Sequence, residues 1–227
     1  FVAPCQPGAS PLSVLGRPYP RAALGLLMLA SKPLFFFDFV DPGSRLASHM
    51  IDEAGAAGAV RWCGFELRPP PEAMIDPRDP DWRARRARVA DQAGELGFPM
   101  EIPHLVPWTR KAHELAEFAR ERDCYDEVRR AIFQAHFVDR IDVGRIDLLV
   151  EVAHLAGLDR TETRVALDVD RCTGTVLAHR AAARDRGVTD VPALVHAGRR
   201  LQGLATREAV GEWARWIADE LTPTTEE

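Results

Sequence analysis

Blocks of apolar residues along the chain alternate with short polar and turn-forming segments. The first block, residues 34–40 (LFFFDFV), has the length and aromatic content of a buried strand. Residues 41–44 (DPGS) follow. Because Asp is a favoured helix N-cap and Pro a favoured first helical residue, we expect a helix from there to about Gly55 or Gly58. Residues 59–67 (AVRWCGFEL) predict a second strand, and this order implies parallel strands joined by a right-handed crossover.

A proline-rich segment over residues 69–80 ends this unit, and beyond it the apolar spacing becomes helical. Helices are predicted over 81–96 with Asp81 as N-cap, from about Thr109, around 125–133, over 142–156 and over 159–167. Their apolar faces, which include Phe133, Phe137 and Leu149, predict an internal helical core, with a dimer interface as the alternative.

The last part of the chain returns to mixed structure. A long helix is expected over 170–186, paired strands over 193–197 and 199–203, and a final helix capped by Thr206. We therefore predict an α/β fold with a large all-helical insertion. Its parts are an N-terminal extension (1–31), a discontinuous α/β domain (32–72 and 170–221), the helical insert (73–169) and a polar tail (222–227).

The charge balance is acidic, with 29 Lys and Arg against 34 Asp and Glu and a net charge of −5. This balance argues against a nucleic-acid-binding protein. The run Arg83, Arg85, Arg86 and Arg88 is matched by nearby acids, and we interpret it as a solvated helix face. Residues 22–30 are apolar but too few to span a bilayer, which needs about 20 residues.

Export is the alternative interpretation of the N-terminal region, because Arg21 precedes an apolar stretch that ends at Ala30, as in a secretory signal. The four cysteines are widely scattered along the chain: Cys5, Cys63, Cys124 and Cys172. Their spacing contains no CxxC pair and no close metal-ligand spacing, and it is typical of buried thiols in a reducing cytosol.

Five segments in a fixed order resemble a known family. They are FFFDFVDPGSRLA, VRWCGFELRP, AHELAEFA, AIFQAHFVDRIDVGRIDLLVEVAHLAGLD and GVTDVPALVHAGRRLQG, within about residues 32–221. Together they resemble the thioredoxin fold with a helical insert of the DsbA-like superfamily. The chain is most similar to its FrnE-type branch, which is related to 2-hydroxychromene-2-carboxylate isomerases and kappa-class glutathione transferases. The role implied is thiol–disulfide oxidoreductase, or glutathione-dependent isomerase or transferase.

The resemblance assigns the chemistry to the start of the first helix. Redox members carry a CPxC motif there, and the helix N-terminus lowers the pKa of the first cysteine. This chain has Asp41-Pro42-Gly43-Ser44 at that position, which keeps the proline and lacks both cysteines. Thiol–disulfide exchange proceeds by thiolate attack, which neither Asp nor Ser can perform.

By the same resemblance the Val191–Pro192 bond is cis and faces the helix start. The groove between the two is the predicted ligand site, with Asp41 and Ser44 as candidate catalytic residues and Pro42, Gly43, Val191 and Pro192 as candidate binding residues. Trp108, Thr109 and His113 of the insert are expected to form its lid, and Trp108 stands where relatives often carry Asn before Thr.

Three interpretations of Asp41 stay open. It is a helix cap in a site without redox chemistry, or part of a site that binds a thiol or carbonyl ligand through Ser44, or a general base. Glutathione-using relatives place a serine hydroxyl where Asp41 stands, and a carboxylate there repels a thiolate.

The remaining candidate side chains are interpreted as structural. We expect His113 and His136 to be interface residues rather than metal or substrate ligands. Asp41, Ser44 and His49 form no catalytic triad, because no oriented third partner is evident. Cys63 should be buried on the face of its strand opposite to Trp62.

We therefore expect a cytoplasmic protein that binds a small thiol or carbonyl compound, or an extended peptide, without disulfide exchange. No cofactor is required, and glutathione is the candidate ligand. The alternatives are a glutathione-dependent isomerase or transferase and a non-catalytic peptide- or protein-binding module. A homodimer is the candidate assembly. The enzyme predicts a closed pocket converging on Ser44, and the binding module a free backbone edge at Val191. Side chains that fill the groove would contradict both.

Overall fold

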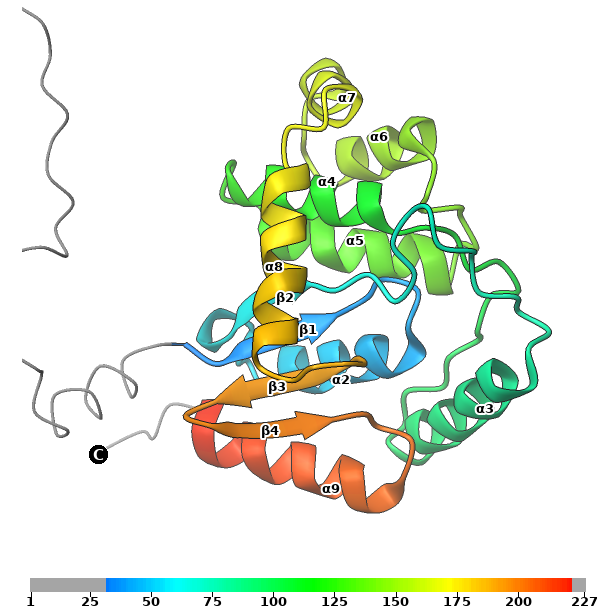
Figure 1. The fold of residues 1–227 in the computed structure, drawn as a ribbon, viewed down its shortest axis with the longest axis vertical. Helices are drawn as coiled ribbons and strands as arrows, with labels where there is room; N and C mark the ends of the chain where they lie inside the picture. Colours follow the sequence, from blue (N-terminus) through cyan, green and yellow to red (C-terminus); the bar gives the residue numbers. More distant parts are fainter. Residues whose placement is uncertain (1–31, 222–227) are drawn as a thin grey trace, which may run out of the picture. The chain divides into compact units, whose positions relative to one another are not determined.

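A four-stranded mixed sheet forms the centre of the computed structural model, which describes residues 32–221. The predicted extension (1–31), with its signal-like stretch, and the predicted tail (222–227) lie outside the described residues. The strand order is β2-β1-β3-β4, and the strands are β1 (Leu34–Phe37), β2 (Arg61–Gly64), β3 (Ala193–His196) and β4 (Arg199–Gln202). β1 is parallel to β2 and antiparallel to β3, and β3 and β4 form a hairpin (Figure 1). The predicted parallel pairing is confirmed.

Helices surround this sheet and form a separate layer above it (Figure 1). They are α2 (Pro42–Glu53), α3 (Pro80–Glu95), α4 (Arg110–Arg120), α5 (Tyr125–Phe137), α6 (Ile146–Leu155), α7 (Arg160–Asp168), α8 (Thr173–Asp185) and α9 (Arg207–Trp216), with short turns η2 (Ala57–Ala59) and η3 (Ile217–Leu221). The α/β fold with a helical insertion is therefore as expected. The division of the chain into a discontinuous domain and an insert stays a prediction.

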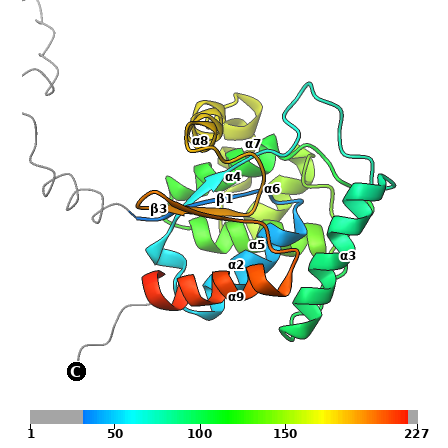
Figure 2. The ribbon, with the colours of Figure 1, turned by 60° about the horizontal axis from the view of Figure 1, so that its bottom comes forward.

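The alternation of side chains in β1 supplies both faces of the sheet. Phe35 and Phe37 face the main core. Phe35 meets Trp62 and Trp213 of α9 edge to face at ring distances of 4.9 and 5.9 Å, and the Phe37 ring lies 5.8 Å from that of Phe133 in α5. Phe36 faces α8 and packs with Cys63 in a second apolar cluster. Figure 2 shows α8 on one side of the strands and α2 and α9 on the other. Trp62 and Cys63 thus lie on opposite faces, as predicted.

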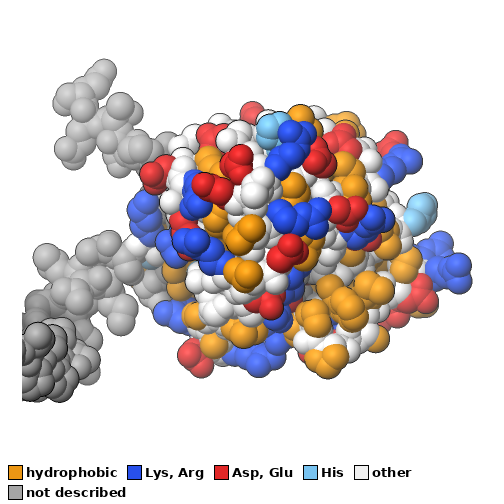
Figure 3. Space-filling view, turned by 90° about the horizontal axis from the view of Figure 1, so that it is seen from above, with side chains coloured by type: hydrophobic (Ala, Val, Ile, Leu, Met, Phe, Trp, Pro, Cys, Tyr) orange, Lys and Arg blue, Asp and Glu red, His pale blue; other side chains and the backbone are white. Residues whose placement is uncertain are grey.

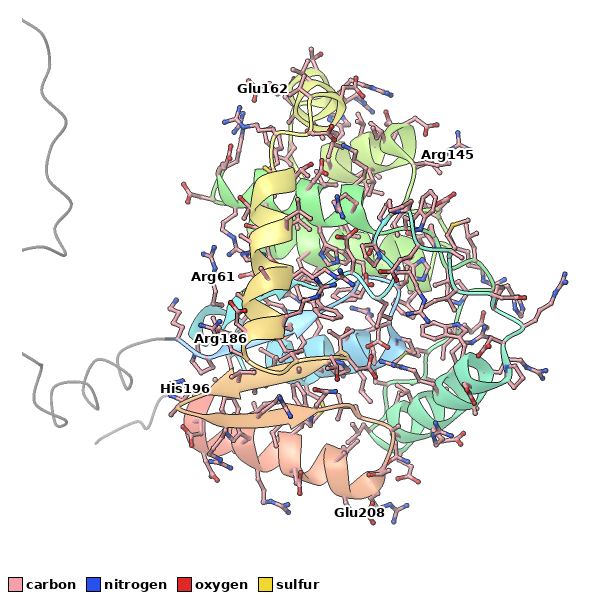
Figure 4. All side chains as sticks on the ribbon, in the orientation of Figure 1. Arg61, Arg145, Glu162, Arg186, His196 and Glu208 are labelled. Carbon is pink, nitrogen blue, oxygen red and sulfur yellow. The ribbon has the colours of Figure 1, made fainter. Side chains whose placement is uncertain are left out.

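The helical layer, formed by α4, α5, α6 and α7, shares the main apolar core with the sheet, with α2 and with α9. α4 packs against α5, α6, α7 and α8. Phe133, Phe137 and Leu149 are fully or almost fully buried within it, which confirms the internal core over the dimer interface. Side chains fill the space between this layer and the sheet, and the labelled Arg145 and Glu162 lie at its outer end (Figure 4).

Several predicted boundaries are wrong because local turns move them. α3 begins at Pro80, and its cap is Asp79 rather than Asp81: Asp79 Oδ1 accepts from the backbone N–H groups of residues 81 and 82 at 3.0 and 2.9 Å. α6 begins only at Ile146, after a turn. α8 begins at Thr173 because Asp170 has a φ of 55° and ends the preceding helix.

The surface of the described part carries both signs of charge. On the face shown in Figure 3, basic and acidic side chains are interspersed and apolar groups lie among them. No helix within residues 32–221 is long and apolar enough to cross a membrane.

Close contact between β2 and α4 predicts a sensitive position. A Cβ added to Gly64 would lie 2.5 Å from His113 Nδ1, and His113 is buried and cannot move aside. We expect Gly64→Ala to lower the free energy of unfolding by about 1–3 kcal/mol through overpacking. Gly94→Ala in α3 meets nothing within 4 Å and is the matched control. It should raise stability by roughly 0.5–1 kcal/mol, measured by urea unfolding. An equal effect of the two substitutions would contradict the contact.

Candidate functional site

Asp41 stands at the start of α2 with its side chain fully buried. Its Oδ2 accepts hydrogen bonds from the Ser44 backbone N–H at 2.6 Å and the Ser44 hydroxyl at 2.8 Å. Pro42 occupies the first helical turn. The predicted cap is therefore confirmed, and it arises from the local preference of Asp-Pro for a helix start.

Ser44 is fully buried, and its hydroxyl group is hydrogen-bonded within the protein. Its single proton is donated to Asp41 Oδ2, and the oxygen accepts from the Asp38 backbone N–H at 3.2 Å. A hydroxyl in this arrangement has no proton left to donate to a ligand. The structure thus places Ser44 beside Asp41, but inside the protein.

Arg85 of α3 supplies the cation that faces Asp41. Its Nη2 lies 2.8 Å from Asp41 Oδ1, and its Nη1 lies 2.9 and 2.8 Å from the two oxygens of Asp190. Nη2 also donates to the Val191 carbonyl oxygen. α3 lies beside the end of the sheet at which β1 leads into α2 (Figure 1). One guanidinium thereby joins the helical insert, the helix start and the loop before β3.

The interpretation of the basic run as a solvated helix face is wrong at Arg85. Arg83 and Arg88 are exposed, whereas Arg85 is largely enclosed. Its partners, Asp41 and Asp190, lie far from it in the sequence, so no local pattern marks it. The helical spacing that places Arg85 on the same face as the buried Trp82 and Val89 was the one available signal.

Burial and charge act against each other in this cluster. Burial raises the pKa of Asp41, with a smaller contribution in the same direction from Asp190, while Arg85 and the Ser44 donors limit that rise. Burial alone would lower the pKa of Arg85, but Asp41 and Asp190 raise it overall. Arg85 therefore stays charged at every pH at which the protein is folded, and it is the main counter-ion of Asp41.

The loop before β3 closes directly onto the start of α2. The Val191–Pro192 bond is cis. A Cβ added to Gly43 would lie 2.8 Å from Pro192 Cδ, so only glycine allows this approach. The Val191 N–H donates to Asp190 Oδ1 at 2.8 Å, and the Val191 carbonyl accepts from Arg85.

These contacts correct two expectations about the groove. The predicted free backbone edge at Val191 is wrong, because both polar groups of that residue are already bonded. The prediction of a pocket converging on Ser44 is wrong as well, because Ser44 is fully buried and its hydroxyl faces Asp41 rather than a cavity. The structure does bring the predicted residues 41–44 and 191–192 together, but as a packed interface.

The three residues predicted as a lid lie elsewhere. Trp108 is 39% exposed, and its Nε1 donates to the Glu72 carbonyl at 2.9 Å. Thr109 precedes α4, is buried, and lines a cavity of about 10 Å³ together with Asp38. His113 is buried, with Nε2 3.3 Å from Asp38 Oδ1. Of the three, His113 reaches the helix start only indirectly, through Asp38.

Asp38 is a buried residue that sequence reasoning did not single out. Its Oδ2 accepts from the Leu67 backbone N–H at 2.7 Å, its Oδ1 faces His113, and its own N–H donates to Ser44. It therefore ties β1, the segment after β2 and α4 to the start of α2. The interruption of an apolar strand by a single carboxylate was a visible signal.

The remaining histidines and cysteines behave as structural residues. His136 is buried, and burial lowers its pKa to about 4. His49 stacks on Phe98 with ring centroids 3.8 Å apart, so it forms no triad with Ser44. Cys63 is buried, and burial raises its pKa to about 11. A thiol with that pKa is not a thiolate at neutral pH and is a poor nucleophile.

An open cleft of about 650 Å³ adjoins the cluster. Arg85 and Asp190 form part of its wall, and its other lining residues are Leu67, Arg68, Ala73, Met74, Ile75, Asp76, Asp79, Asp81, Trp82 and Thr189. The cleft combines carboxylates, guanidinium groups and an apolar part. Within residues 32–221 no group of three His, Cys, Asp or Glu side chains is arranged to hold a metal ion.

Comparisons with known proteins agree on one family. A family model described as the DSBA-like thioredoxin domain matches residues 34–211. Protein YwbO of Bacillus subtilis is 32% identical over 199 residues, which cover 82% of this chain and 94% of YwbO. The structure of a probable DsbA oxidoreductase from Streptomyces coelicolor is similar, with a TM-score of 0.67, 22% identity and coverage of 86% of this chain and 92% of that chain. That of a 2-hydroxychromene-2-carboxylate isomerase has a TM-score of 0.63, 21% identity and coverage of 83% and 98%. At such identities the two structures show a shared fold.

The Asp41–Arg85 pair predicts a pH-dependent stability defect. Arg85→Met leaves a buried carboxylate without its cation, which we expect to lower the free energy of unfolding by about 2–4 kcal/mol near pH 7.5. The folded-state pKa of Asp41, already raised by burial, rises further in this variant. A carboxyl group whose pKa is raised in the folded state contributes stability at pH values below its unfolded-state pKa, and this contribution is lost as the pH rises. The stability defect of Arg85→Met should therefore be smaller near pH 4.5 than near pH 7.5.

Arg88→Met on the exposed face of α3 is the control and should leave stability unchanged at both pH values. Denaturant unfolding gives the free energy of unfolding of both variants and of the wild-type chain at each pH. A defect of Arg85→Met that is the same at both pH values would contradict the assignment of Asp41 as the partner of Arg85.

Proposed function

Because the chain belongs to the DSBA-like thioredoxin domain family, we propose that it is a ligand-binding member of that family without thiol–disulfide exchange. The buried ion pair between Asp41 and Arg85 carries this proposal. It occupies the helix start at which the redox motif is expected, and residues 41–44 contain no sulfur. Disulfide exchange needs an accessible thiolate there, and a carboxylate bound by a guanidinium cannot replace it.

Acid–base and hydroxyl chemistry at the helix start is also unfavourable. Asp41 Oδ1 lies against the Arg85 guanidinium and Oδ2 accepts from Ser44. The side chain is fully buried, so neither oxygen is open to a substrate. The Ser44 hydroxyl is buried and donates to Asp41. A glutathione-dependent isomerase or transferase would need a free donor to stabilise the thiolate, and no observation of this site favours that alternative.

The adjoining cleft supports binding of a small zwitterionic compound. Its Arg68 is exposed and, within residues 32–221, donates one hydrogen bond, to the Leu67 carbonyl at 3.3 Å. Asp81 is exposed at the first turn of α3. Arg68 therefore offers a cation for a carboxylate, and Asp81 offers an anion for an ammonium group. Trp82, Met74 and the other apolar lining residues can cover a short hydrocarbon segment. Glutathione combines two carboxylates, an ammonium group and a short apolar thiol arm, which makes it the probe of choice.

The thiols of the described part fit a reducing compartment. Cys63, Cys124 and Cys172 are all free thiols. We accordingly propose that the protein acts in the cytoplasm, where such thiols stay reduced.

Binding of glutathione and of S-methylglutathione, measured by calorimetry, tests this proposal. We expect the two to bind with equal affinity, because the cleft recognises the charged ends and does not activate the thiol. Arg68→Met should lower the affinity for both compounds by roughly tenfold, because one charge-assisted hydrogen bond is lost. Arg88→Met should change neither. The ultraviolet absorbance of bound glutathione should show no thiolate.

Three outcomes would overturn the proposal. Thiolate absorbance together with selective binding of glutathione over its methyl ether would establish the transferase or isomerase alternative. Acceleration of insulin reduction by the protein would establish disulfide exchange. If neither compound binds at concentrations up to about 1 mM, which corresponds to a binding free energy of roughly 4 kcal/mol, the proposal of a zwitterionic ligand is wrong.

A further inference from the structure

A second pocket, of about 340 Å³, lies apart from the cleft. It is formed by α2, the segment that follows α3, and the C-terminal end of α5. Its lining residues are Arg45, Phe98, Pro99, Met100, Glu101, Phe137 and Val138, and none of them lines the cleft. Its volume is within the range of small-molecule sites, about 300–1,000 Å³.

Arg45 is half-buried and has no anionic partner in contact. Its guanidinium carbon lies 5.0 Å from the centre of the Phe98 ring and 5.8 Å from that of Phe133. Among residues 32–221, no carboxylate oxygen lies within 4.0 Å of the guanidinium nitrogens, and no hydrogen-bond acceptor faces them. A cation partly removed from water without a counter-ion favours the entry of an anion.

The acidic groups near Arg45 are bound by other arginines. Asp52 influences Arg45 electrostatically, but its two oxygens accept from Arg129 at 2.6 and 3.1 Å. Glu101, at the exposed rim of the pocket, is paired with Arg140. Arg45 is thus the charged group of the pocket that has no ion-pair partner within the described chain.

The walls of the pocket are apolar and partly fixed. Phe98 stacks on His49 at 3.8 Å and 13° between ring planes, which holds its ring in place. Phe137 is buried against Phe133. Val138 is 57% exposed, an unusual position for a β-branched apolar side chain that bounds a pocket. These residues offer hydrocarbon and ring surface around a single guanidinium.

We propose that this pocket binds a small organic monoanion, an aromatic or branched carboxylate. Its acid group pairs with Arg45, whose planar fork matches a carboxylate, and its hydrocarbon body lies against Phe98, Phe137 and Val138. The site is independent of the glutathione cleft, because the two share no residue.

Naphthylacetate and its neutral amide are the probes, since they differ only in charge. We expect saturable binding of the carboxylate by calorimetry and binding of the amide weaker by roughly tenfold or more. Arg45→Met replaces the aliphatic stem of the arginine by an unbranched apolar side chain of similar extent and removes the guanidinium charge. It should reduce naphthylacetate affinity to that of the amide and leave the amide unchanged. Arg130→Met, an exposed position on α5, is the control and should have no effect.

Val138→Glu is a second variant that leaves the packing of Arg45 intact. It places a negative charge at the mouth of the pocket. It should therefore weaken the binding of naphthylacetate more than the binding of its neutral amide. Equal affinity for acid and amide, or full binding by Arg45→Met, would overturn the proposal. Competition of naphthylacetate with glutathione would also overturn it, because it would place the anion in the cleft.

Discussion

The carboxylate of Asp41 is fully buried at the start of α2, and the protein around it is arranged to hold that charge. A buried anion is tolerated when a cation and several donors face it. Ser44 provides two donors from the same helix turn, and Arg85 provides the cation from a distant helix. Since Arg85 also binds Asp190 and the Val191 carbonyl, the position of α3 and that of the loop before β3 both depend on this one charge.

The same contacts determine which chemistry the family fold retains here. The thioredoxin-like scaffold usually offers a reactive group at the helix start and open backbone at the opposing proline loop. In this chain the reactive position is an ion pair, and the backbone of Val191 is bonded on both sides. The two binding sites proposed above accordingly lie outside this position: one is the cleft beside Arg85, and the other is the separate pocket around Arg45.

Most of the fold could be read from the sequence because its determinants are local. The apolar run of β1, the Asp-Pro helix start and the hydrophobic spacing of the helices each act within a few residues. The closed groove could not be read in this way. Arg85 looks like any exposed arginine of a charged helix until the chain folds and brings Asp41 and Asp190 to it. His113 of α4 likewise packs closely against Gly64 of β2, which is possible because glycine has no side chain. The two residues are far apart in the sequence, so no local pattern marks this contact.

A double-mutant cycle on Asp41→Asn and Arg85→Met tests whether these two side chains form a buried ion pair in solution. The free energies of unfolding of the wild-type chain, both single variants and the double variant give the coupling between the two side chains. We expect the double variant to be more stable than the sum of the single effects predicts by about 1–3 kcal/mol, because each single change leaves a buried partner unpaired. Additivity within about 0.5 kcal/mol would show that the two groups are not paired in solution and would contradict the account.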